Sequence, residues 1–112
     1  MNNAAIEELF ESLGRVSIRR MFGGKGIYHD GAICALEVSG EILLKADAET
    51  APHFRAAGSR QWAYEGKTGK PVLMPYWSIP DEALDDPDLM TKWVRLAAEA
   101  GRRGAKPRKG SE

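Results

Sequence analysis

The chain has 112 residues, which is enough for one domain with a hydrophobic core and too few for two. Its single cysteine, Cys34, excludes an intramolecular disulfide and favours a reducing compartment. No stretch of the sequence approaches the roughly 20 apolar residues that a bilayer span requires, so we expect a soluble, cytoplasmic protein.

The net charge is zero, but the charges are unevenly distributed. Residues 1–100 hold 11 Lys and Arg against 15 Asp and Glu, whereas residues 101–112 hold five basic side chains and one acidic one. Broad binding to nucleic acid depends on clustered positive charge, so the acidic body argues against such a face on the folded domain. Residues 102–112 have no apolar periodicity, and we expect a basic, disordered tail there, after a domain that spans residues 1–101.

The first segment predicts a helix that ends at Gly14. Its apolar residues recur at helical spacing: Ile6, Leu9, Phe10 and Leu13. Asn2 or Asn3 can cap the start by accepting a hydrogen bond from a free backbone N–H. Glycine adopts the left-handed conformation that ends many helices, which is why we place the end at Gly14.

Residues 16–46 predict three or four antiparallel strands in a meander. Short apolar and β-branched runs alternate with turn signals at Gly23-Gly24, Asp30-Gly31 and Ser39-Gly40. Asp-Gly between two such runs is a strong hairpin signal, because a two-residue turn of this type needs positive φ at both positions. The runs on both sides of Ser39-Gly40 are apolar at nearly every residue, so we expect these strands in the centre of the sheet.

Residues 47–58 predict a short helix with Asp47 as its N-cap, with Phe54 and Ala57 turned inward and with Gly58 at its end. A second hairpin follows, in which the sequence GKTG joins two strands. Pro71 and Pro75 have no N–H for a strand ladder, so the second strand of this hairpin should lie at an edge or carry a bulge.

The last predicted helix starts at Asp86-Pro87 and ends at Gly101. Leu89, Trp93, Leu96 and Ala100 would form its apolar stripe. Strands grouped between helices, without alternation of strand and helix, indicate an α+β domain. We expect a single antiparallel sheet of about five strands with flanking helices.

Catalytic and metal sites are poorly supported by the sequence. The glycines of RRMFGGKGIYHDG are followed by a further strand pattern, whereas a phosphate-binding loop must lead into a helix. Cys34, His29 and His53 match no zinc-ligand spacing. Cys34 and His29 could approach each other across the Asp30-Gly31 turn, but burial of Cys34 as a small hydrophobe is the favoured interpretation. We therefore expect no enzyme activity, no cofactor and no metal.

The second hairpin carries four aromatic residues near three cations: Trp62, Tyr64, Tyr76 and Trp77 with Arg60, Lys67 and Lys70. This combination fits packing of the aromatic residues against Trp93, a surface for a protein partner, or a platform for single-stranded nucleic acid. The tail could add sequence-independent contacts to phosphate through its basic residues: Arg102, Arg103, Lys106, Arg108 and Lys109. It could equally be a soluble extension.

Two blocks of the sequence, RMFGGKGIYHDG at 20–31 and YEGKTGKPVLMPYWSIP at 64–80, resemble the N-terminal domain of the TfoX/Sxy family. The resemblance runs from about Ile6 to Ala100. It implies an α-β(3)-α-β(2)-α order similar to the secretion-chaperone-like fold, a tendency to form homodimers, and a link to regulation of natural competence in bacteria. The full-length regulators of this family carry a second, helical domain and act with a cyclic-AMP receptor protein. The resemblance supplies no catalytic residues.

We therefore predict a non-enzymatic protein-interaction module in transcriptional or competence regulation, with a nucleic-acid-binding module as the alternative. The candidate partner surface consists of ten residues from the two blocks and the hairpin: Arg20, Gly23, Gly24, Tyr28, Trp62, Tyr64, Lys67, Lys70, Tyr76 and Trp77.

Overall fold

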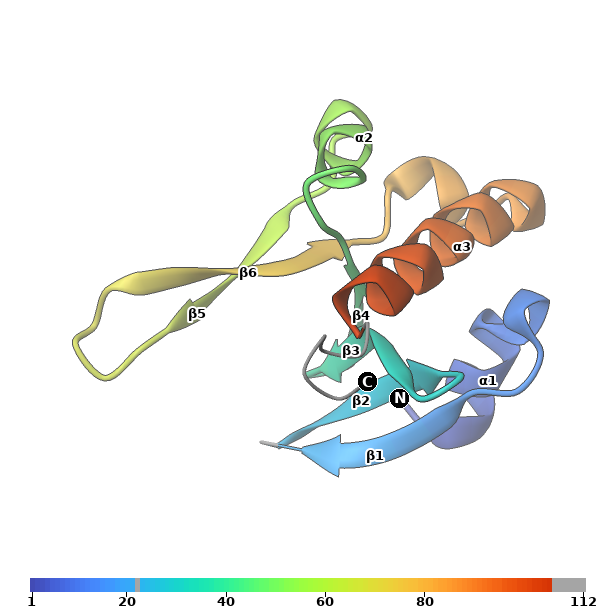
Figure 1. The fold of residues 1–112 in the computed structure, drawn as a ribbon, viewed down its shortest axis with the longest axis horizontal. Coiled ribbons are helices and arrows are strands. Elements are labelled where there is room, and N and C mark those ends of the chain that lie inside the picture. Colours follow the sequence, from blue (N-terminus) through green and yellow to red (C-terminus); the bar gives the residue numbers. More distant parts are fainter. Residues whose placement is uncertain (22, 106–112) are drawn as a thin grey trace, which may run out of the picture.

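The computed structural model describes residues 1–21 and 23–105, and these form one sheet with three α-helices and two short 3₁₀ helices (Figure 1). The helices in chain order are α1 (Asn3–Leu9), η1 (Glu11–Leu13), α2 (Ala51–Ala56), η2 (Asp81–Ala83) and α3 (Pro87–Gly104). The strands are β1 (Ser17–Met21), β2 (Gly24–His29), β3 (Ala32–Val38), β4 (Glu41–Lys45), β5 (Gln61–Glu65) and β6 (Pro71–Ser78).

The sheet has six antiparallel strands in the order β1-β2-β3-β4-β6-β5. The α+β class and the single antiparallel sheet are thus confirmed, and β3 and β4 are central as predicted. The sheet has six strands and not about five, because four strands precede α2, within the three or four that residues 16–46 predict and one more than the resemblance implies. β1 turns into β2 at Gly23, where φ is +79°, within the predicted turn signal.

The predicted turns are confirmed in detail. Asp30 and Gly31 have φ values of +51° and +82°, and Ser39 and Gly40 have +52° and +84°. Positive φ at both central positions is the geometry that matches the twist of the flanking strands. The glycines of the first block therefore lie in a strand-turn-strand unit.

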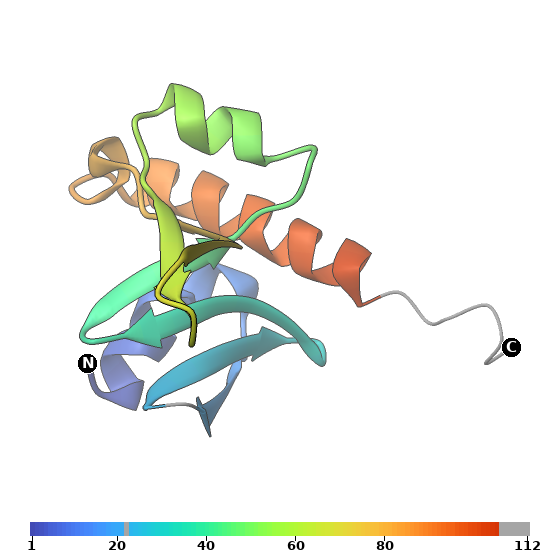
Figure 2. The same ribbon diagram turned by 90° about the vertical axis from the view of Figure 1, so that its left-hand side faces the viewer.

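One face of the sheet packs against the helices in the main hydrophobic core. α1 contributes Ile6 and its C-cap residue Phe10, α2 contributes Phe54, and α3 contributes Trp93 and further residues. Figure 2 shows α2 and α3 on the same side of the sheet. The ring of Phe54 lies 4.8 Å from that of Trp93, centroid to centroid, so the short helix α2 is joined to α3 by aromatic contact.

The end predicted for the last helix is wrong. Asp86 caps α3 by accepting hydrogen bonds from the backbone of Asp88 and Leu89, as expected, but the helix continues to Gly104. Gly101 lies inside the helix, where a Cβ atom would collide with the backbone carbonyl oxygen of Ile33. This glycine therefore allows α3 to approach β3 closely and does not end the helix.

The start predicted for the second helix also needs correction. Thr50, and not Asp47, is the N-cap of α2. Asp47 instead closes the preceding turn: its carboxylate accepts a hydrogen bond from the Thr50 N–H, and the Asp47 N–H donates to the Thr50 hydroxyl. The reciprocal bonds are those of a capping box, one turn before the regular helix.

The strand with two prolines carries the predicted irregularity. The β5–β6 register shifts between Gln61↔Trp77 and Ala63↔Leu73, so β6 accommodates extra residues around Pro75. The C-terminal part of β6 pairs with β4 from Lys45↔Tyr76 to Leu43↔Ser78. The N-terminal part, before the irregularity, pairs only with β5 and extends away from the body (Figure 1). We call this projecting part of β5 and β6, with its turn, the arm.

Candidate protein-interaction surface

The second face of the sheet is built by strands alone. Leu36, Leu43 and Tyr76 are buried there. Partly buried side chains from β1, β3, β5 and β6 pack around them: Met21, Ile33, Val38, Trp62 and Met74. No helix residue among those described belongs to this cluster. We call this strand-only surface the open face.

Two cations lie over tyrosine rings of the open face. The Arg19 guanidinium is 5.0 Å from the ring centroid of Tyr28, and the Lys45 ammonium is 5.3 Å from that of Tyr76. Burial raises the pKa of Tyr76, so its hydroxyl remains neutral and can act as a hydrogen-bond donor. The open face thus presents apolar area with cationic side chains at its margin, which is the composition of many protein interfaces.

The arm extends the open face away from the body. Tyr64 pairs with Val72, and partners directly opposite in a ladder share one side of the sheet. Trp62 is two residues from Tyr64, so it lies on the same side, with its ring 6.2 Å from that of Tyr64. Tyr64 is 54% exposed and Val72 47%.

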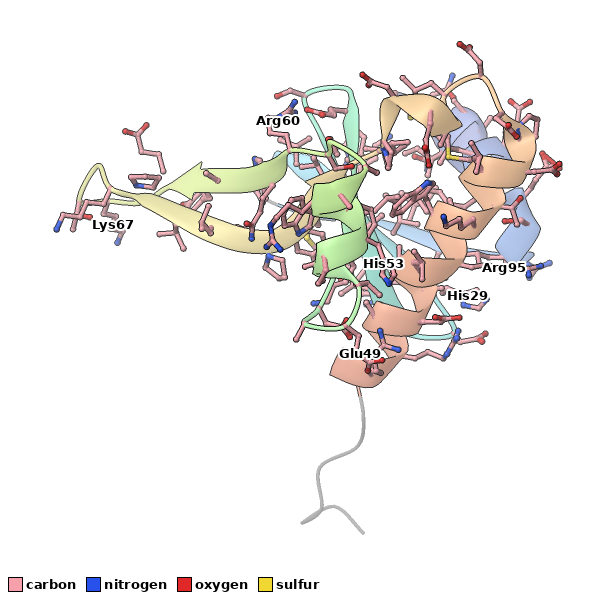
Figure 3. All side chains as sticks on the ribbon, turned by 90° about the horizontal axis from the view of Figure 1, so that it is seen from above. His29, Glu49, His53, Arg60, Lys67 and Arg95 are labelled. Atoms are coloured by element: carbon pink, nitrogen blue, oxygen red, sulfur yellow. The ribbon has the colours of Figure 1, made fainter. Side chains whose placement is uncertain are left out.

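The opposite side of the arm is also apolar. Leu73 pairs with Ala63 there and is 66% exposed. The tip carries Lys67 and Lys70, both exposed, and Figure 3 shows Lys67 at the far end of the arm. The arm therefore displays large apolar side chains on both sides and positive charge at its tip.

Four of the ten residues predicted for a partner surface lie together in the structure, and two more lie at the tip of the arm. Tyr28, Trp62, Tyr64 and Tyr76 share the open face, and Lys67 and Lys70 sit at the tip of the arm.

Trp77 is separated from this surface. It follows Tyr76 in β6 and so points to the helix-covered face, where it is 5% exposed and its ring is 6.3 Å from that of Phe54. Of the interpretations left open for the aromatic residues of the hairpin, core packing applies to Trp77, which lies in the same cluster as Trp93. Its assignment to the partner surface is wrong.

Arg20 also lies away from the open face, whereas Gly24 pairs with Met21 of the open-face cluster. Arg20 follows Arg19 and therefore points to the opposite side of β1. With Gly23 and Gly24 it lines a pocket of about 530 Å³ that also contains Lys25 and Glu37. Lys25 already donates hydrogen bonds to Met1 and Asn3, whereas the exposed Arg20 forms no ion pair with any described residue.

Several residues of the surface were missed by the sequence analysis: Arg19, Lys45, Val72, Leu73 and Met74. The signal for Val72 and Met74 was present in the alternation along KPVLMPYW. The exposure of Leu73 had no local signal, because it depends on β6 extending beyond β4.

The predicted basic tail begins inside α3. Arg102 and Arg103 belong to the last turn of the helix, and Lys106, Arg108 and Lys109 lie outside the described residues. The Arg103 guanidinium donates to both Asp47 carboxylate oxygens, at 2.6 and 3.1 Å, and is 3.2 Å from Glu49. The hydrogen bond from Arg103 lowers the pKa of Asp47 to about 2. Arg103 is therefore used within the fold and is not free to bind phosphate.

Cys34 is fully buried, as predicted, and burial raises the pKa of its thiol to about 12. His29 lies near the surface of the fold, with Nε2 3.1 Å from the carbonyl oxygen of Leu13. Within residues 1–21 and 23–105, no three His, Cys, Asp or Glu side chains are grouped so that they could hold a metal ion. Among the described helices, none is long and apolar enough to cross a membrane.

A family model described as the TfoX N-terminal domain matches residues 8–101, which include every strand and α2 and nearly all of α3. No curated protein matches the chain.

Proposed function

The chain belongs to the TfoX N-terminal domain family, and from this premise we propose that it is a non-enzymatic protein-interaction module that takes part in transcriptional or competence regulation in the cytoplasm. The open face and the arm form the binding surface. Their partner is a protein that covers the exposed apolar side chains.

The observation that carries this proposal is the exposure of large apolar residues along the arm. Tyr64 and Val72, 54% and 47% exposed, continue from the buried cluster around Tyr76, and Leu73, 66% exposed, lies on the other side of the arm. Contiguous apolar area of this kind is uncommon on monomeric proteins and marks sites of interaction. Trp and Tyr side chains are also the residues that most often dominate binding energy at interfaces.

Burial of the only cysteine supports the non-enzymatic part of the proposal. A nucleophilic cysteine must be accessible and ionised near neutral pH, and Cys34 is neither. No cofactor or metal is required for the proposed role.

A second copy of the chain is one candidate partner, because pairing of two open faces would cover the same side chains on both. Light scattering after size exclusion measures this directly. If the wild-type chain is a dimer and Val72→Asp is a monomer, the open face is the dimer interface. If the wild-type chain is a monomer at all concentrations, the partner of this surface is a different protein.

The alternative function is nucleic-acid binding through the tail and the hairpin. It predicts affinity that falls steeply with salt and is lost when residues 102–112 are removed. Engagement of Arg103 by Asp47 and Glu49 leaves fewer cations for this role, so we favour the protein partner.

The test is capture of partners from the native host by the wild-type chain and by Leu73→Asp. Ala56→Asp is the control with the same change in charge, because Ala56 is exposed on α2 and lies outside the open face and the arm. We expect a protein that is captured by wild type and by Ala56→Asp and is lost with Leu73→Asp. Equal capture by all three chains would contradict the proposal.

A further inference from the structure

A groove of about 830 Å³ lies between α1 and η1 on one side and η2 and the first turn of α3 on the other. α1 and the start of α3 are at the end of the molecule away from the arm (Figure 1). Leu9, Leu84 and Met90 give it an apolar lining. Leu84 is 60% exposed, although it is a large apolar residue between two helices. The groove shares no residue with the open face or the arm.

Carboxylates surround the apolar lining on both sides. Glu8 and Glu11 come from α1 and η1, and Asp85 and Asp86 come from the segment before α3. No Lys, Arg or His lines the groove. Among the described residues, none of these four carboxylates forms an ion pair.

Some carboxylates elsewhere in the fold are paired with cations, whereas those of the groove have no such partner among the described residues. Glu41 is 2.6 Å from Arg60, and Asp47 is 2.6 Å from Arg103. The groove thus combines exposed apolar area with uncompensated negative charge. A partner that covers the apolar side chains must also supply cations, because carboxylates that lose water without a counter-charge are strongly unfavourable.

The positions of the groove carboxylates indicate which kind of positive charge the partner must supply. No group of them within residues 1–21 and 23–105 could hold a metal ion, so the positive charges must be distributed along the partner. An anion is excluded although the N-terminus of α3 opens here, because the Asp86 carboxylate already accepts its hydrogen bonds from Asp88 and Leu89.

We propose that this groove binds a basic amphipathic helix of a protein partner. Apolar residues on one side of that helix cover Leu9, Leu84 and Met90, and its Lys or Arg residues face the carboxylates on either side. Helix-in-groove recognition commonly uses apolar anchors in this way, with flanking charges fixing the orientation. The site is separate from the open face, so this inference stands or fails independently of the proposed function.

The test uses the full chain and a synthetic helical peptide of leucine and lysine, about 14 residues or four turns long, with its leucines on one face. The control peptide has glutamate in place of lysine. We expect calorimetry to show binding of the lysine peptide only, with affinity that falls in about 1 M salt, where charges are screened beyond about 3 Å. Equal binding of both peptides, or binding of neither, would overturn the proposal.

Two charge variants with the same change in net charge locate the site. The groove variant is a double substitution, Glu8→Lys and Asp85→Lys, which reverses the charge of two exposed groove carboxylates. The control variant, Glu65→Lys and Glu99→Lys, reverses the charge of two exposed carboxylates outside the groove. The groove variant should weaken binding of the lysine peptide about tenfold, given the usual energies of exposed ion pairs. The control variant should retain nearly all of it. Equal losses would show attraction by net charge alone and would contradict a groove site.

Leu84→Asp tests the apolar part of the site, with Leu73→Asp on the arm as its control. We expect the lysine peptide to lose affinity for the first variant and not for the second. A peptide with the sequence of residues 102–112 carries five basic side chains and no large apolar one. If this peptide bound as tightly as the leucine–lysine peptide, positive charge alone would be sufficient for binding. That result would contradict the proposal that the groove binds an amphipathic helix.

Discussion

The two faces of the sheet are covered in different ways. The helix-covered face is filled by side chains from α1, α2 and α3, and Phe54, Trp77 and Trp93 lie within one core cluster. The open face buries Leu36, Leu43 and Tyr76 with strand side chains alone and continues into exposed residues on the arm. The comparison indicates that the first face holds the fold together and that the second is available for binding.

The largest difference between the two faces should appear in stability. Phe54→Ala removes a fully buried ring that contacts Trp93 and Trp77, and it should lower the free energy of unfolding by about 3–5 kcal/mol. Leu73→Ala, on the arm, should change it by less than about 0.5 kcal/mol. Urea denaturation followed by circular dichroism measures both. Comparable losses for the two variants would show that the arm contributes to the folded core.

The next effect concerns the contact between α3 and the sheet. Gly101→Ala adds a Cβ against the Ile33 carbonyl and should destabilise the protein by about 1–3 kcal/mol, although alanine favours helices. Gly104→Ala is the matched control in the same helix, since its Cβ would meet only the Lys45 side chain at 3.8 Å. That variant should be neutral or more stable by up to about 1 kcal/mol. Stabilisation by both substitutions would refute the close approach.

A smaller effect is expected at the ion pair that ties the end of α3 to the turn before α2. Arg103 lowers the pKa of Asp47 from 3.8 to about 2, so this contribution to stability is complete above the unfolded-state pKa and is lost as the pH falls from about 4 to about 2. Both side chains are partly exposed, so solvent screening keeps this contribution small.

Denaturation of wild type and Asp47→Asn at several pH values measures this contribution. The difference between the two proteins should be largest above pH 4 and should disappear near pH 2. Glu49→Gln should have a smaller effect, because Glu49 is more exposed and its contact with Arg103 is longer. A difference that persists unchanged at pH 2 would assign the effect of Asp47→Asn to the hydrogen bonds of its turn.

Local features of the fold could be read from the sequence because they depend on local chemistry. The Asp30-Gly31 turn and the Asp86 cap follow from the conformations and hydrogen bonds that these residues favour. Gly101 was misread because its role depends on a carbonyl of β3, far away in the chain. A glycine near the end of a helix pattern has the same local appearance whether it ends the helix or allows a close approach.

The candidate site could be predicted only in part. Trp62, Tyr64 and Tyr76 share one face of the sheet, whereas Trp77 lies on the other, and the rule that successive strand residues alternate would have separated Tyr76 from Trp77. The face left uncovered could not be predicted, because it depends on how all three helices pack. The acidic groove could not be predicted from the sequence either. Helix capping was a sufficient explanation for Asp86, and nothing in the sequence indicated that Asp86 lies close to Glu8.

β6 is a single strand that belongs to both regions, and this continuity has a consequence for recognition. The first residues of β6 form one strand of the arm. Near the other end of β6, Trp77 packs against Phe54 in the main core. The arm is therefore anchored at its root and leaves the body in a set direction. A partner would meet a preformed projection, so little of its binding energy would be spent on immobilising the arm.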